Sequence, residues 1–301
     1  MRLRHPGKAM VIALTLACSD YEYSELGFTE WFHQPEVSDH ADVLFVVDDS
    51  ASMSEEQDRL ASNFGVFATA LADSYADFQI AVTTTDPESM GQLSGPILTS
   101  ETAGLEEAFT EAVTVGTDGH RDERGFRAAV AALDMNPELV RTESRVHVIF
   151  LSDEDDHSVE PVEDFVESMT WYGEADFRAH GIIGDLPYGC ASGQSAASAG
   201  TRYVEAVELT EGYRDSICVD DYSDILQRIA LQVIGWNDTF VLARLPDPET
   251  LKVWVDSVVI PEREVDGWTY APGDNAILFH GRAVPRPGME VLVEYLPLMG
   301  S

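Results

Sequence analysis

DVLFVVDDSASM, residues 42–53, is the stretch that decides the fold of this chain. Its first half contains a short apolar run, Val43–Val47, with no polar alternation, which is typical of a strand covered by helices on both faces. Its second half places Asp48, Ser50 and Ser52 at alternate positions directly after that strand. The stretch therefore predicts a buried parallel strand that ends in a row of oxygen donors.

A second predicted strand ends in the same way. Residues 145–152, RVHVIFLS, are followed at once by Asp153. In open α/β sheets, ligands bind beyond the carboxyl ends of the strands, near the point where the strand order reverses. Carboxylate and hydroxyl oxygens suit Mg²⁺, Mn²⁺ or Ca²⁺. An alternative for Ser50 and Ser52 is that they only cap the helix that follows.

Strand and helix signals alternate from residue 41 to residue 237, which predicts an α/β domain with a mostly parallel sheet. Ser54–Gln57 has the pattern of a capping box that opens the first helix. From residue 238 to residue 301 the helix signals are lost and short strand-like runs alternate with Pro- and Gly-rich turns, which predicts a small all-β module. The expected strands are 42–47, 77–84, 145–152, 177–183 and 215–219 in the first domain, and 240–243, 251–260, 268–270, 276–279 and 289–296 in the second. The first expected helix begins at Ser54. The other expected helices cover 101–113, 121–133, 161–171, 201–211 and 222–234.

The amino-terminal residues have the order of an export signal. Basic residues precede the apolar run Ala9–Ala17, which ends at Cys18. The segment Leu14–Cys18 resembles a bacterial lipobox, and this resemblance implies a lipid on Cys18 and an anchor in a membrane, with plain secretion as the alternative. Residues 1–18 are therefore expected to be a signal peptide with lipobox, and we expect an exported lipoprotein of the outer membrane or cell surface. Residues 19–40 are expected to be a tether whose aromatic side chains dock on the first domain.

Two further cysteines, Cys190 and Cys218, remain for pairing. Two cysteines in an exported chain usually form a disulfide, and two free buried thiols are the alternative. The formal net charge of -36 over 301 residues excludes an ordinary nucleic-acid binder, because such proteins need a basic face to neutralise phosphates.

Three stretches together resemble a von Willebrand factor A domain with a metal-ion-dependent adhesion site. They are DVLFVVDDSASM, the turn Gly116–Gly119 and residues 147–156, HVIFLSDEDD, and the resemblance covers roughly Asp42 to Trp236. The chain is also similar to bacterial lipoproteins of this family, in which a tail with Trp-Thr-Tyr and Asn-Ala-Ile patterns follows the domain.

The resemblance implies a role for each candidate ligand. Ser50 and Ser52 would bind a divalent cation directly, Asp48 directly or through water, and Asp153 mainly through water. The threonine that the family supplies from a second loop falls best on Thr117, although the next helix starts later after Thr117 than is usual. Thr114 and Asp118 are alternatives for this position. Asp49 stands in a slot that is often neutral.

The residues following Asp153, Glu154–Asp156, are expected to form a solvated loop face, with Ca²⁺ binding as an alternative. The family's function implies a protein partner that offers an acidic side chain to the cation. The chain contains no GxSxG elbow, no phosphate-binding loop and no Ser-His-Asp spacing, so we expect a binding protein rather than an enzyme. The alternatives are an envelope protein with a stabilising or vestigial metal site, and a metal-dependent hydrolase.

Overall fold

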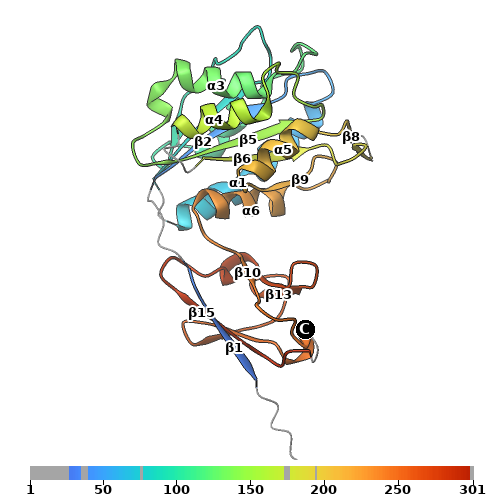
Figure 1. Ribbon diagram of the computed structural model, residues 1–301. Helices are drawn as coiled ribbons and strands as arrows, with labels where there is room; N and C mark the ends of the chain where they lie inside the picture. Colours follow the sequence, from blue (N-terminus) through green and yellow to red (C-terminus); the bar gives the residue numbers. More distant parts are fainter. Residues whose placement is uncertain (1–26, 35–39, 75–76, 173–176, 194, 299–301) are drawn as a thin grey trace, which may run out of the picture.

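The structure, a computed structural model, describes residues 27–34, 40–74, 77–172, 177–193 and 195–298. An α/β domain carries a central, mostly parallel sheet, and antiparallel sheets of a β module follow it (Figure 1). Cys18 and the predicted signal lie outside the described residues. Among the described helices, none combines the length and apolarity that crossing a bilayer would need.

The central sheet has six strands in the order β4-β3-β2-β5-β6-β9. All neighbouring strands are parallel except the edge strand β4, which runs antiparallel to β3. Three strands, β3, β5 and β6, have the predicted bounds. The strands are β2 (His40–Val47), β3 (Asp77–Thr84), β4 (Leu98–Thr99), β5 (Arg145–Ser152), β6 (Phe177–Ile183) and β9 (Arg214–Ser216).

Helices cover both faces of this sheet, which confirms the predicted fold class (Figure 1). Side chains of β2 alternate between two apolar cores: Phe45 packs with α1, α2 and α6, and Leu44 packs with α3, α4 and α5. The helices are α1 (Ser54–Asp73), α2 (Leu105–Val113), α3 (Gly125–Met135), α4 (Val162–Tyr172), α5 (Thr201–Leu209) and α6 (Ser223–Val233). Burial on both faces explains why β2 has no polar alternation.

The strand order reverses at β2. The chain passes from β2 to β3 on one side and later returns to β5 on the other side of β2. The loops that leave β2 and β5 therefore diverge at the carboxyl edge of the sheet, where open α/β sheets bind their ligands. These are the loops that begin at Asp48 and Asp153.

The β module contains two antiparallel sheets, in the orders β1-β15-β11-β12 and β10-β14-β13. Apolar side chains from both sheets, including Phe240, Val253 and Trp268, are buried between them. The strands are β1 (Phe28–His33), β10 (Thr239–Val241), β11 (Lys252–Val255), β12 (Val258–Ile260), β13 (Trp268–Ala271), β14 (Ala276–Phe279) and β15 (Glu290–Tyr295).

One predicted boundary is wrong. Residues 28–33, assigned to a tether, form β1 and pair along their whole length with β15. Their aromatic rings dock on the β module instead of the first domain, with centroids 5.6 Å apart for Phe28 and Tyr295 and 5.4 Å apart for Phe32 and Phe240. Strand pairing satisfies the backbone groups of this segment, which a tether would leave to water.

The small, polar segment between β6 and α5 contains regular structure. It contains the hairpin of β7 (Cys190–Ser192) and β8 (Ser195–Ala197). The predicted disulfide between Cys190 and Cys218 is confirmed and ties this hairpin to the segment that leads into α6.

We expect the double variant Cys190→Ala/Cys218→Ala to lower the free energy of unfolding by roughly 3–4 kcal/mol, because the bond restricts the unfolded chain over a closed loop of this length. The cysteines are 28 positions apart in the sequence. Urea unfolding measures the effect. A reducing agent should bring the wild-type protein to the level of the variant and leave the variant unchanged; equal loss in both proteins would contradict the assignment.

A pair of neutral histidines lies inside the sheet. His147 on β5 and His180 on β6 are both fully buried, and His147 Nδ1 lies 2.9 Å from His180 Nε2. The backbone N–H of Tyr213 donates to His180 Nδ1, so the His180 proton resides on Nε2 and is donated to His147. Burial lowers the pKa of His147 far below its usual range and that of His180 to about 3, and the charge of Arg178 adds to both shifts.

This pair should make the protein acid-sensitive. Below pH 6.5, an ordinary histidine pKa, the unfolded chain binds protons that the folded chain excludes, so stability falls as the pH falls. Each histidine contributes about 2 kcal/mol of loss between pH 7 and pH 5. The variant His147→Gln removes one titrating ring and should lose about 2 kcal/mol less than wild type over this range in urea unfolding. Identical pH dependence in both proteins would contradict this account.

Candidate functional site at the strand ends

Asp48 is the centre of the polar cluster at the carboxyl edge of the sheet. The residue is fully buried, and both oxygens of its carboxylate are held by the protein. The backbone N–H of Ser50 donates to Oδ1 at 2.8 Å, and the hydroxyl of Ser152 donates to Oδ2 at 2.7 Å. Burial raises the pKa of Asp48, and these hydrogen bonds oppose the rise. The carboxylate is therefore fixed by the loop that follows β2 and by the last residue of β5.

Three other predicted ligands lie around Asp48. The hydroxyls of Ser50 and Ser52 are 3.3 Å apart, and the Ser52 hydroxyl also forms a hydrogen bond with the Asp153 carboxyl group. The pKa of Asp153 is raised to about 6, first by burial and then by the nearby Asp48 carboxylate. Ser50 and Asp153 are buried, whereas Ser52 is exposed. The cluster thus has a buried floor and a side open to solvent.

The expected capping box is not formed. The α1 helix begins at Ser54 without a side-chain cap, and the buried side chain of Gln57 turns toward the loops instead. Gln57 Nε2 donates to the carbonyl of Asp48 at 2.9 Å and to the carbonyl of Gly116 at 2.8 Å. A buried amide that satisfies two carbonyls is worth more here than a helix cap in water. Gln57 therefore joins the first loop, between β2 and α1, to the second loop, between α2 and α3.

The second loop lies against the first through its backbone. The N–H of Gly119 donates to the carbonyl of Asp49 at 2.9 Å, and a Cβ on Gly119 would lie only 2.2 Å from Asp49 Oδ1. Thr117 is half-buried in this loop, and within the described residues it forms no hydrogen bond with the other four predicted ligands. Its role as a ligand stays a prediction.

The residue of the second loop that does approach Asp48 is Glu123. It is fully buried, and its carboxyl group lies next to that of Asp48. The hydroxyl of Thr85, which follows β3, donates to Glu123 Oε2, while Oε1 has no protein partner. The pKa of Glu123 is raised to about 8 by burial and then by the charge of Asp48. Sequence reasoning missed Glu123 because it placed the residue in the first turn of a helix expected over 121–133, whereas α3 begins at Gly125.

The donor set fits a hard divalent cation. Asp49, Glu123 and Asp153 each present a buried carboxylate oxygen with no hydrogen-bond partner, at Oδ1, Oε1 and Oδ1. Buried unpaired carboxylates are costly, and a cation held by oxygen ligands relieves that cost. Among the described residues, no three carboxylate, imidazole or thiol groups by themselves form a metal site. The hydroxyls of Ser50 and Ser52 would therefore have to complete it, as the sequence pattern predicts.

The third loop, which follows β5, differs from its predicted solvated form. Asp156 is buried and accepts a hydrogen bond from the N–H of Phe126 at 3.1 Å, at the start of α3. Arg202 Nε lies 3.1 Å from Asp156 Oδ2. Asp156 therefore supports the first turn of α3, which begins two residues after Glu123, rather than facing water.

The hairpin of β7 and β8 flanks the same loop. The N–H of Ser198 donates to the carbonyl of Asp153 at 2.8 Å. The hydroxyl of Ser195 donates to the buried carboxylate of Glu56 on α1 at 2.6 Å, and Arg59 contacts both groups. The disulfide-bonded hairpin thus braces the third loop from the side.

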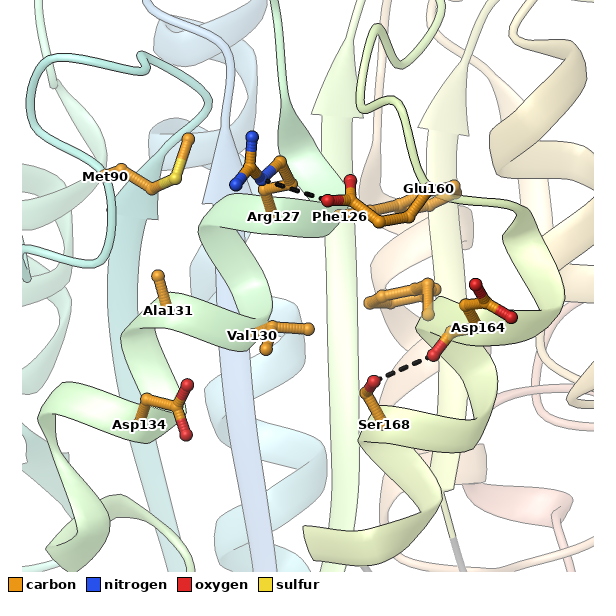
Figure 2. Close-up of a pocket in the computed structure, with 10 residues that line it drawn as sticks. Met90, Phe126, Arg127, Val130, Ala131, Asp134, Glu160, Asp164 and Ser168 are labelled. Atoms are coloured by element: carbon orange, nitrogen blue, oxygen red, sulfur yellow. Dashed lines mark hydrogen bonds and ion pairs between the residues drawn. The ribbon is translucent and has the colours of Figure 1, made fainter.

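A cavity of about 310 Å³ lies elsewhere, between α3 and α4 (Figure 2). Phe126 and Phe165 stack at its apolar floor with ring centroids 4.2 Å apart. Its rim carries Asp134, Asp164 and the ion pair of Arg127 with Glu160. None of the predicted ligands lines this cavity, so it is separate from the strand-end cluster.

Comparison with protein-family profiles gives no match, and comparison with curated proteins gives none either. Solved structures with a similar arrangement include the pilus adhesin SpaC of Lactobacillus rhamnosus GG in its open conformation (14% identity, 89% of this chain, 40% of that chain, TM-score 0.47). Another is a von Willebrand factor type A protein of Catenulispora acidiphila (14% identity, 90% of this chain, 66% of that chain, TM-score 0.46). A third is proximal thread matrix protein 1 of the mussel byssus (11% identity, 71% and 51%, TM-score 0.43).

The chain spans only 40% to 66% of the length of these proteins. At such identities and scores, the similarities concern the course of the chain and carry no information on ligands or partners.

We expect Gln57→Leu to lower the free energy of unfolding by about 1–3 kcal/mol, because the buried carbonyls of Asp48 and Gly116 lose their donor. The matched control is Gln227→Leu, at a half-buried position of α6, which should cost less than about 0.5 kcal/mol. Urea unfolding of the two variants measures the difference. Equal stability would show that Gln57 does not hold the loops together.

Proposed function

We propose that this chain is an exported binding protein that captures a protein partner at a surface organised by a divalent cation, Mg²⁺ or else Mn²⁺ or Ca²⁺. The observation that carries the proposal is the polar cluster at the carboxyl edge of the sheet, where the strand order reverses. There Asp48, Ser50, Ser52 and Asp153 are close together and buried carboxylate oxygens lack partners. The similarity of these sequence motifs to a metal-ion-dependent adhesion site supports the same function.

The proposed role of each residue follows from its surroundings. Ser50 and Ser52 present hydroxyls side by side, and Asp48 is held rigidly beneath them by its hydrogen bonds. Asp153 is linked to the cluster through Ser52 and would act through water. The cation would fix the first and third loops relative to each other and attract an oxygen atom of the partner, such as that of an acidic side chain.

The proposed location is the outer membrane or cell surface, with a lipid on Cys18 as anchor. The Cys190–Cys218 disulfide supports an oxidising compartment. The order of charges and apolar residues before Cys18 supports export.

Cation-dependent capture tests the function. The purified chain and the variant Ser50→Ala/Ser52→Ala are used to capture proteins from surface fractions of the producing organism, in Mg²⁺ and in EDTA. We expect a set of partners that requires both Mg²⁺ and the two serines, because hydroxyl ligands are lost in the variant. The matched control, Ser62→Ala, changes an exposed serine of α1 and should behave as wild type.

Two outcomes would contradict the proposal in different ways. A partner set that is unaffected by EDTA and by the double variant would remove cation-dependent binding. A melting temperature that rises with Mg²⁺ only when both serines are present, with no captured partner, would favour the alternative of an envelope protein with a stabilising metal site.

A further inference from the structure

We propose that Glu123, rather than Thr117, is the cation ligand of the second loop, and that the site consequently holds its cation without any carboxylate from a partner. This inference rests on the proposed function, since it concerns the same site. It differs from the acidic-partner expectation because the chain itself supplies the second carboxylate next to Asp48.

The position of Glu123 is the first argument. Its carboxyl group lies next to that of Asp48, since the two groups interact electrostatically, and this places them within reach of one ion. The residue is fully buried, yet Oε1 has no hydrogen-bond partner. Two carboxyl groups can share a buried site only through a proton or a cation. The unpartnered Oε1 is therefore an oxygen available to a cation.

The support around Glu123 is the second argument. The Thr85 hydroxyl donates to Oε2, and the backbone carbonyl of Glu123 accepts the N–H of His157 at 2.7 Å. The N–H of the next residue, Arg124, donates to the carbonyl of Thr85 at 3.0 Å. Three segments of the chain thus fix Glu123, as ligands of metal sites are commonly fixed by surrounding hydrogen bonds. Thr117 makes no comparable contact among the described residues.

The charge balance is the third argument. A divalent cation between Asp48 and Glu123 is formally neutralised by these two carboxylates alone. Asp49 and Asp153 add further negative charge nearby, since the charge of Asp48 acts on both of them. An incoming carboxylate would therefore meet a site that is already negative. The partner is expected to contact this cation through a neutral oxygen, or to bind beside it.

Cation affinity of the isolated protein tests the inference. Mn²⁺ is titrated calorimetrically into the chain, with no partner present, for wild type, Glu123→Gln, Thr117→Val and Ser50→Ala. Glutamine keeps the shape of the side chain and removes its charge. We expect Glu123→Gln to weaken Mn²⁺ binding at least tenfold and Thr117→Val to leave it unchanged. The melting temperature in EDTA checks folding, and Glu123→Gln should melt no lower than wild type, because glutamine has the same shape and carries no charge that burial could penalise.

The possible results separate this inference from the proposed function. If Ser50→Ala and Thr117→Val weaken Mn²⁺ binding while Glu123→Gln does not, the cation site stands and the role of Glu123 is refuted. If wild type itself does not bind Mn²⁺, both the proposed function and this inference fail. If Glu123→Gln unfolds in EDTA, the variant Glu123→Thr replaces it, and retention of wild-type affinity by that variant would refute the role of Glu123.

Discussion

The burial of one carboxylate, that of Asp48, is the constraint on which the carboxyl edge of this protein depends. Position 48 follows a strand with apolar cores on both faces, so its side chain lies where water cannot solvate it. A buried charge is tolerated only with compensating hydrogen bonds or an opposite charge. Ser50 and Ser152 donate the hydrogen bonds that compensate the buried charge of Asp48. Glu123 is a second acid in contact with Asp48, and its presence increases the need for an opposite charge.

The loops at this edge hold the buried acidic side chains next to one another. Gln57 holds the first loop to the second, and Asp156 supports the start of α3, so that the residue two positions before it, Glu123, stays next to Asp48. These supports use side chains of a helix and of the neighbouring loop, not the ligands themselves. The order of the strands is what makes this possible, because β2 and β5 are neighbours and their loops diverge around a common space.

Local sequence pattern was sufficient for most of the fold and for part of the site. β3, β5 and β6 were predicted with their observed bounds because short, mostly apolar runs rich in β-branched and aromatic residues specify strands. β1 was missed because its partner, β15, lies at the other end of the chain, and no local signal reports such a pairing. Gln57 and Glu123 were misread for a related reason. Their neighbours in the sequence resemble a helix cap and the first turn of a helix, and only the folded chain shows what they touch.

The late start of α3 after Thr117 was the one sequence signal that pointed to Glu123. In the structure that helix begins at Gly125, and Glu123, two residues before it, lies beside Asp48, where Thr117 was expected. If Asp48 and Glu123 neutralise the charge of the cation, that charge cannot distinguish one protein partner from another. Selectivity must then come from the surrounding surface. The disulfide-bonded hairpin touches the third loop at Asp153, and the segment that enters it carries Tyr188 with 94% of its surface exposed. Tyrosine is one of the residue types enriched among those that contribute most to protein binding.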